Sequence, residues 1–149
     1  TLLGFLPLRE RYDYFGNVSG GIGWGIAAAV GVQLAQPHRR VVAVIGDGSA
    51  MYSIQALWSA AKQRLPMSFV IANNGGYRII KLRLKSFHGY EQFIGMDFDE
   101  PAIDPAGLAQ AFGMKGLRAT TPSAFEHAME EAVAGTAPVL LAASVQGHV

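Results

Sequence analysis

The sequence contains no cysteine among its 149 residues, which excludes disulfide bridges and thiolate chemistry. Charge is scarce and balanced: charged residues make up 15% of the chain, and the formal net charge is +1. This balance gives no basis for binding nucleic acid or an anionic membrane surface. The longest apolar stretch, residues 22–35, is interrupted by Gln33 and is too short to span a bilayer. The first residue is Thr1 rather than Met, so we expect a piece of a longer protein, for which the absence of a visible signal peptide says little. The lack of cysteine is compatible with a reducing cytosol, and a cytoplasmic location is the expectation.

Half of the residues are hydrophobic, so the chain is expected to form one domain with a real core. Short apolar runs alternate with helical patterns, which predicts an α/β fold: a doubly wound parallel sheet with helices on both faces. Thr121 and Pro122 are typical of an N-cap and a first helical residue. Residues 88–104 have no period and are expected to form a long loop. The expected strands are residues 12–15, 41–45, 67–72, 115–119 and 138–145, and the expected helices are residues 22–35, 50–64, 77–87, 105–112 and 122–134.

Two polar motifs each follow an apolar run that is typical of a buried parallel strand. Residues 46–49 (Gly-Asp-Gly-Ser) follow the first run, and the pair Asn73-Asn74 follows the second. With one crossover helix between them, both motifs fall at the carboxyl ends of strands in one sheet, where open α/β folds bind ligands. Asp47 supplies a carboxylate and Asn74 an amide oxygen, and such donors hold Mg²⁺ together with phosphate oxygens.

The glycines of the first motif have a physical role beside the carboxylate. Gly46 and Gly48 permit sharp turns and let a phosphate group approach the main chain closely. The amides of Gly48 and Ser49 face the start of the next helix and are expected to donate to an anion. The two motifs together therefore predict a metal–diphosphate site.

The pair of motifs resembles the signature of the thiamine diphosphate (ThDP) enzymes of the 2-oxo acid decarboxylase and acetolactate synthase group. Within that group, residues 46–61 and Asn73–Tyr77 are most similar to the benzoylformate decarboxylases. The resemblance extends from about Tyr14 to the C-terminus and is poor over residues 82–104. It implies that residues 1–149 form the diphosphate- and Mg²⁺-binding domain, with the pyrimidine-binding and middle domains outside this chain.

The resemblance assigns roles to particular residues. Mg²⁺ is expected on the Asp47 carboxylate, the Asn74 side chain and the Gly76 carbonyl, and the Tyr77 amide is expected to face the diphosphate. On the pyrimidine side, Gly20 would offer its carbonyl to the amino group. Ile22 would give its amide and support the bent cofactor from below.

On the substrate side, the resemblance implies that Ile80 reaches toward the substrate. Leu82 and Arg83 stand where aromatic residues would line an aryl pocket, so the choice between an aryl and an alkyl 2-oxo acid stays open.

The family's glutamate that protonates the cofactor belongs to the pyrimidine domain, and no residue of this chain matches it. The resemblance therefore implies that this chain alone is inactive. It also implies that the site is completed by the pyrimidine domain of another subunit, in a homodimer or homotetramer. The expected reaction is non-oxidative decarboxylation of a 2-oxo acid, and the alternative is carboligation as in acetolactate synthase.

A different class of function is also open, because residues 23–28 fit the G-x-G-x-x-A form of a dinucleotide fingerprint. Asp47 lies 19 residues beyond Ala28, near the position of a ribose-binding acid. An NAD-binding domain is disfavoured because it leaves Gly48 and Asn73-Asn74 without a role, and because no clean strand directly precedes the glycines.

The remaining chemistry-bearing side chains lack a motif. The four histidines, at positions 38, 88, 127 and 148, have no metal-type spacing. Trp24, Trp58 and Tyr52 are expected to pack on helix faces or at a subunit interface.

Overall fold

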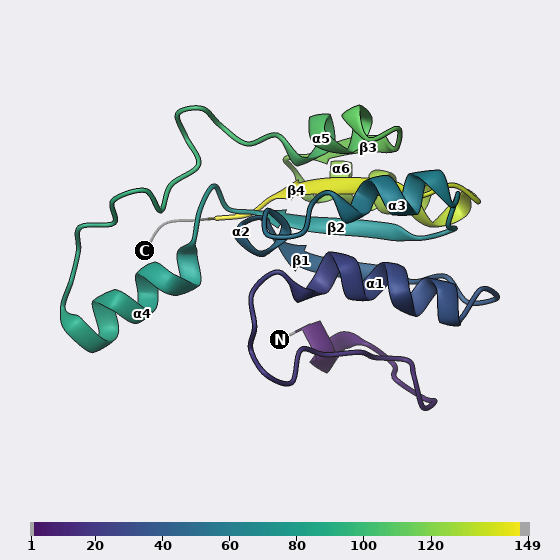
Figure 1. Ribbon diagram of the computed structural model, residues 1–149, viewed down its shortest axis with the longest axis horizontal. Coiled ribbons are helices and arrows are strands. Elements are labelled where there is room, and N and C mark those ends of the chain that lie inside the picture. Colours follow the sequence, from purple (N-terminus) through teal and green to yellow (C-terminus); the bar gives the residue numbers. More distant parts are fainter. Residues whose placement is uncertain (1, 147–149) are drawn as a thin grey trace.

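The computed structural model describes residues 2–146, and its centre is a sheet of four parallel strands in the order β1-β2-β4-β3 (Figure 1). Along the chain, the structure begins with a 3-10 turn at Leu2–Phe5. The strands are β1 (Val42–Gly46), β2 (Ser68–Asn73), β3 (Lys115–Ala119) and β4 (Val139–Ser144). The helices are α1 (Trp24–Ala35), α2 (Asp47–Ala50), α3 (Ala56–Lys62), α4 (Arg78–His88), α5 (Pro105–Ala111) and α6 (Pro122–Ala134).

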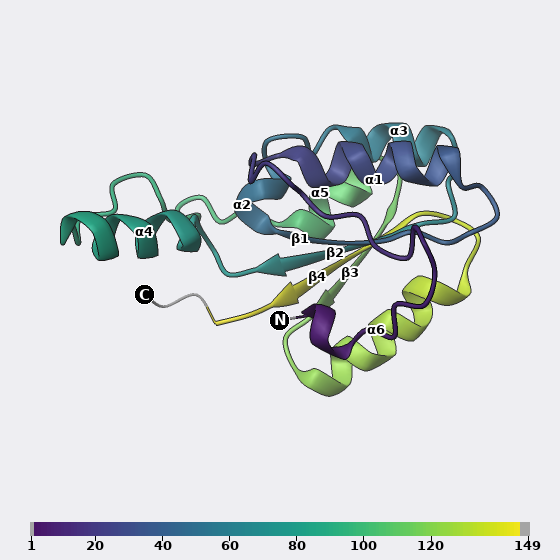
Figure 2. The ribbon, with the colours of Figure 1, turned by 90° about the horizontal axis from the view of Figure 1, so that it is seen from below.

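Helices cover both faces of the sheet, as the sequence predicts. Figure 2 shows α1, α3 and α5 on one face and α6 on the other. The larger core lies between the sheet and helices α1, α3 and α5, where Phe69 and Ile71 of β2 cluster with Ile26 and Leu57. The smaller core lies under α6, around Leu141. Alternate residues of the strands thus face opposite helical layers, which is why the central strands are apolar between the polar residues at their ends.

The strand register brings the two polar motifs together. Gly46, the last residue of β1, pairs with Ala72 of β2. Asp47 therefore leaves the sheet beside Asn73 and Asn74, at the carboxyl ends of two neighbouring parallel strands. This is the edge where ligands bind in open α/β sheets.

The expectation that both motif-bearing strands are buried is wrong for β1. This strand pairs only with β2 in the described part of the chain, so it lies at the edge of the sheet. Val42 and Val44 are 44% and 51% exposed, while Ile45 points to the covered face and is buried. Helix α6 packs mainly on β3 and β4, at the other side of the sheet from β1.

The expected strand at residues 12–15 does not form. Tyr12 has a left-handed φ of 76°, which interrupts an extended run. The Asp13 carboxylate instead accepts from the amide of Arg9 and pairs with Arg39. These bonds, the backbone amides first, lower the pKa of Asp13 to about 2. Local side-chain bonding therefore replaces pairing in the sheet.

The single helix expected over residues 50–64 is divided. A short α2 precedes turns at residues 51–55, and α3 follows. The backbone between the helices uses bonds three residues apart, such as Ser53 N to Ala50 O and Ala56 N to Ser53 O. These shorter-range bonds tighten the backbone at residues 51–55, which lie beside the glycine-rich loop, residues 14–22, that precedes α1.

The other expected elements are confirmed within one or two residues at each end. Thr121 caps α6, since its hydroxyl accepts from the Ala124 amide. Residues 89–104 contain no helix and form only isolated bridges. Helix α4 stands away from the sheet (Figures 1 and 2). No helix within residues 2–146 combines the length and apolar character needed to cross a membrane.

Candidate cofactor site

The Asp47 carboxylate is the centre of the site and is 2% exposed. Its Oδ1 accepts from the Gly48 amide at 2.9 Å. Its Oδ2 accepts from the amides of Gly75 and Gly76 at 2.8 and 3.1 Å. No lysine or arginine in the described residues pairs with it. A buried negative charge held only by neutral amides favours an added cation.

The second motif places two further oxygens near this carboxylate. The Asn74 Oδ1 is buried and accepts no hydrogen bond within residues 2–146, which is rare for a buried polar atom. The Gly76 carbonyl likewise receives no backbone hydrogen bond among the described residues, and it lies 3.6 Å from a Cβ built on Gly48. The Asp47 carboxylate thus contacts the turn at Gly75 and Gly76, and the Asn74 amide oxygen and the Gly76 carbonyl belong to the same turn.

Close packing requires glycine at positions 48 and 76. A Cβ on Gly48 would lie 2.7 Å from the Tyr77 ring, and a Cβ on Gly76 would lie 2.4 Å from the Met96 carbonyl oxygen. Real Cβ atoms do not approach other atoms so closely. Gly46, in contrast, is exposed and has open space around it.

The Tyr77 amide, which the resemblance places opposite a diphosphate, has a partner within the protein. It donates to the Met96 carbonyl at 2.9 Å, because Gly76 forms a bridge with Asp97 in the loop that follows α4. The Tyr77 ring instead packs edge-on against Phe98, with centroids 4.8 Å apart. Burial raises the pKa of the Tyr77 phenol, and the neighbouring Tyr52 hydroxyl adds to the shift.

The glycine loop before α1 places Gly20 and Ile22 at the surface. Gly20 has a left-handed φ of 73°, and Ile22 is 43% exposed. The Asn17 side chain organises this loop: its oxygen accepts from the Gly20 amide at 3.0 Å, and its nitrogen donates to the Gly21 carbonyl. The motifs of the sequence do not single out this role of Asn17, although an Asn shortly before Ser and Gly is a common signal for such a turn.

Ser49 joins this loop to the Gly-Asp-Gly motif, because its hydroxyl accepts from the Gly23 amide at 3.0 Å. The Ser49 amide, at the end of the Gly-Asp-Gly turn, is the group expected to meet a diphosphate. Both halves of the predicted site are thus in direct contact.

Of the residues expected near a substrate, Ile80 is half-buried in the first turn of α4, and Leu82 and Arg83 are exposed. The buried Lys81 pairs with Asp97, which fastens the loop 89–104 to this helix. The aromatic residues Trp24, Trp58 and Tyr52 are 44–57% exposed. Of the two roles expected for them, packing on helix faces therefore does not explain their exposed surface, and a subunit interface stays a prediction.

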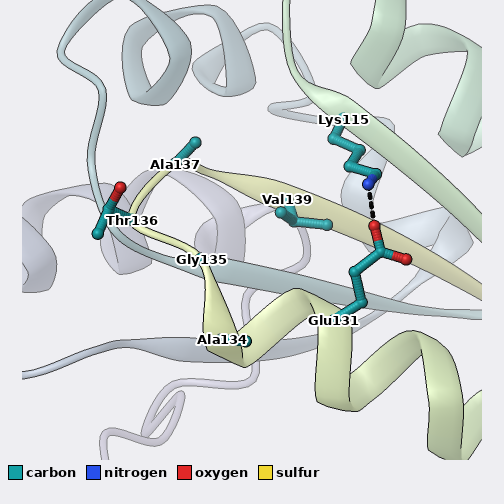
Figure 3. A pocket seen from close by; sticks show the side chains of 7 residues that line it. All are labelled: Lys115, Glu131, Ala134, Gly135, Thr136, Ala137 and Val139. Atoms are coloured by element: carbon teal, nitrogen blue, oxygen red, sulfur yellow. Dashed lines mark ion pairs between the residues drawn. The ribbon is translucent and has the colours of Figure 1, made fainter.

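Two other features of the described residues were candidates for a functional site, a metal cluster and a surface hollow. In the part of the chain that the structure describes, no three His, Asp or Glu side chains gather as a metal cluster, and His148 lies outside it. A hollow of about 420 Å³ lies at the opposite end of the sheet, where β3 and β4 begin (Figure 3). It is lined mainly by small residues with the Lys115–Glu131 ion pair at its rim.

Comparison with known families decides between the two classes of function. Residues 2–143 match the model of the thiamine pyrophosphate enzyme, C-terminal TPP binding domain. The chain belongs to this family. The NAD-binding alternative is therefore wrong, and the geometry agrees: no strand precedes the glycines from residue 2 onward, and Asp47 is buried under amides rather than open to a ribose.

Similar proteins include decarboxylases and synthases. The chain is 43% identical over 142 residues to benzoylformate decarboxylase of Pseudomonas aeruginosa, covering 95% of this chain and 26% of that protein. It is 31% identical over 137 residues to the acetolactate synthase large subunit of Porphyra purpurea, covering 92% and 23%. Among solved structures, the ThDP-dependent 4-hydroxybenzoylformate decarboxylase of Rhodococcus jostii RHA1 is 42% identical with a TM-score of 0.81, covering 87% and 24%. The chain spans about a quarter of the length of these relatives.

Proposed function

We propose that the protein containing this chain is a ThDP- and Mg²⁺-dependent decarboxylase of a 2-oxo acid, similar to benzoylformate decarboxylase. The observation that carries the proposal is the buried Asp47 carboxylate beside the unpartnered Asn74 Oδ1. Both groups are satisfied by one divalent cation, and membership of the thiamine pyrophosphate family supplies the reason for a diphosphate next to it. The decarboxylases among the relatives favour this reaction over carboligation.

The residues present fit Mg²⁺ and the diphosphate. Asp47, Asn74 and the Gly76 carbonyl would hold the ion, which takes its remaining ligands from phosphate oxygens and water. The amides of Gly48 and Ser49 would donate to the diphosphate. When bound, ThDP supplies the electron sink that accepts the electrons released with CO₂.

The chain's own residues then have distinct tasks. Asp47 would offset part of the charge of the cation, and Gly48 would let the diphosphate approach the backbone. Gly20 and Ile22 would hold the other end of the cofactor, and Ile80 would face the substrate. None of these groups transfers a proton, so the acid that activates the cofactor must come from elsewhere.

We infer that a pyrimidine domain of another subunit provides that acid, in a homodimer or homotetramer. Two features support this inference: the chain spans about a quarter of its relatives, and Ile22, Tyr52 and Trp24 expose apolar surface beside the site. The 149-residue chain alone should accordingly be inactive. The cytoplasmic location and the absence of nucleic-acid or membrane partners stay predictions.

Turnover of candidate substrates by the full-length protein tests the reaction class. We expect ThDP-dependent release of CO₂ from pyruvate, a branched 2-oxo acid or benzoylformate, with the aldehyde as main product and without added oxidant. Acetolactate as the main product would instead support the carboligase alternative. The 149-residue chain and a reaction without ThDP serve as controls, and rapid turnover by either would contradict the proposal.

Replacing Ile22 tests the support of the bent cofactor. Because Ile22 is 43% exposed, Ile22→Ala should leave little cavity and change the free energy of unfolding by less than about 1 kcal/mol. The rate constant kcat should fall more than ThDP affinity does, since the diphosphate anchor is intact. Ile79→Ala, at a 60% exposed isoleucine of α4, is the matched control. Equal losses in affinity and kcat would show that Ile22 acts only in binding.

A further inference from the structure

The segment that follows the metal motif also holds the glycine loop, through Gly23. The Gly23 amide donates to the Ser49 hydroxyl at 3.0 Å, and the Gly23 carbonyl accepts from the Ser53 hydroxyl at 2.6 Å. Tyr52 closes the third side, because a Cβ placed on Gly23 would lie 2.5 Å from the Tyr52 Cβ. We call Gly23, Ser49, Tyr52 and Ser53 the Gly23 clamp.

The clamp is the polar connection between the glycine loop and the rest of the described domain. Asn17 makes its hydrogen bonds within residues 17–21, and no hydrogen bond in the described structure joins residues 14–22 to another part of the chain. The loop is otherwise exposed, Val18 completely so. Besides the packing of α1, which begins directly after this loop, the clamp is therefore what holds Ile22 relative to Asp47.

Peptide geometry explains how the two hydroxyls act. The Gly23 amide belongs to the rigid Ile22–Gly23 peptide plane, so the bond to Ser49 orients the plane that ends at the Ile22 Cα. The Gly23 carbonyl belongs to the next plane, and the bond to Ser53 holds it at the start of α1. Ser49 and Ser53 thus fix both planes, and both serines lie within six residues of Asp47.

We propose that Ser49 and Ser53 are positioning residues that hold Ile22 at a set distance from the Asp47 motif and so set the angle between the two halves of the cofactor. This inference rests on the proposed function, because it assigns the two hydroxyls a task only if ThDP joins these elements. Neither hydroxyl touches the reacting atoms. Binding of the diphosphate at the Ser49 amide is thereby coupled to the position of Ile22.

The test compares Ser53→Ala with Ser59→Ala in the full-length protein. Ser59 is a half-buried serine of α3 whose hydroxyl makes no hydrogen bond within the described residues, so the chemical change is matched. We expect kcat of Ser53→Ala to fall about tenfold, because one hydrogen bond that orients a reacting group is lost. Affinity for ThDP, measured by calorimetry with Mg²⁺, should stay within about threefold of the wild type.

Two further readouts separate positioning from general stability. The near-ultraviolet circular dichroism of bound ThDP should change in Ser53→Ala and not in Ser59→Ala, while the melting temperatures of the two apo variants should differ by no more than about 4 °C, the effect of one lost hydrogen bond. Ser53→Thr, which keeps the hydroxyl, should restore both kcat and the spectrum. A Ser53→Ala protein that matches Ser59→Ala in kcat and spectrum overturns this inference alone. Equal losses of ThDP affinity and kcat also overturn it, whereas a wild-type protein that binds no ThDP overturns the proposed function as well.

Discussion

Asp47→Ala should abolish Mg²⁺-dependent binding of ThDP to the full-length protein. The substitution removes the only carboxylate of the predicted metal site and leaves the amides of Gly48, Gly75 and Gly76 without their acceptor. Loss of one partner of a buried charge pair costs about 3–5 kcal/mol, so the affinity should fall at least about a hundredfold. Isothermal titration calorimetry with ThDP and Mg²⁺ measures this change.

Two companion variants make the result specific. Asp47→Asn keeps an oxygen for the amides and removes the charge, so it should fold and still lose the metal. Asp99→Ala makes the same truncation at an exposed loop carboxylate and should bind ThDP normally. Wild-type affinity in Asp47→Asn and Asp47→Ala would show that the metal is held elsewhere.

Gly23→Ala should destabilise the protein more than a typical substitution, which costs about 1 kcal/mol. Gly23 has a φ of 89°, and placing an L-residue in a left-handed conformation costs about 1–2 kcal/mol. The new Cβ would also lie 2.5 Å from the Tyr52 Cβ, and relieving such overpacking costs about 1–3 kcal/mol. Thermal melting of the apo protein measures the combined effect.

Gly31→Ala is the matched control within the same helix. Gly31 lies inside α1, is exposed and has nothing within 4 Å of an added Cβ. This substitution should raise the free energy of unfolding by about 0.5–1 kcal/mol, because alanine loses less backbone entropy than glycine on folding. Similar melting temperatures for the two variants would show that the Gly23 contacts carry no stability.

Part of the fold and of the site follows from short-range patterns. Apolar runs followed by Gly-Asp-Gly or Asn-Asn indicate strands that end in ligand-binding groups, and β1 and β2 form within one residue of where such runs predict them. Thr121 caps α6 because its own side chain reaches the amide three residues on, which is a purely local bond. The expected strand over residues 12–15 does not form, and the reason is also local. The Asp13 carboxylate accepts from the Arg9 amide and turns the chain back on itself, which no common sequence pattern signals.

The sequence by itself determined the α/β class, the family resemblance and the presence of Asp47 and Asn74 at strand ends. These depend on residue type and spacing, which a linear pattern records. Only the tertiary structure decided that β1 is an edge strand, that the Asn74 oxygen is buried without a partner, and that Ser53 holds Gly23. Each of these depends on groups that folding brings together from distant parts of the chain, 30 residues apart for Ser53 and Gly23, and no local pattern specifies such a meeting.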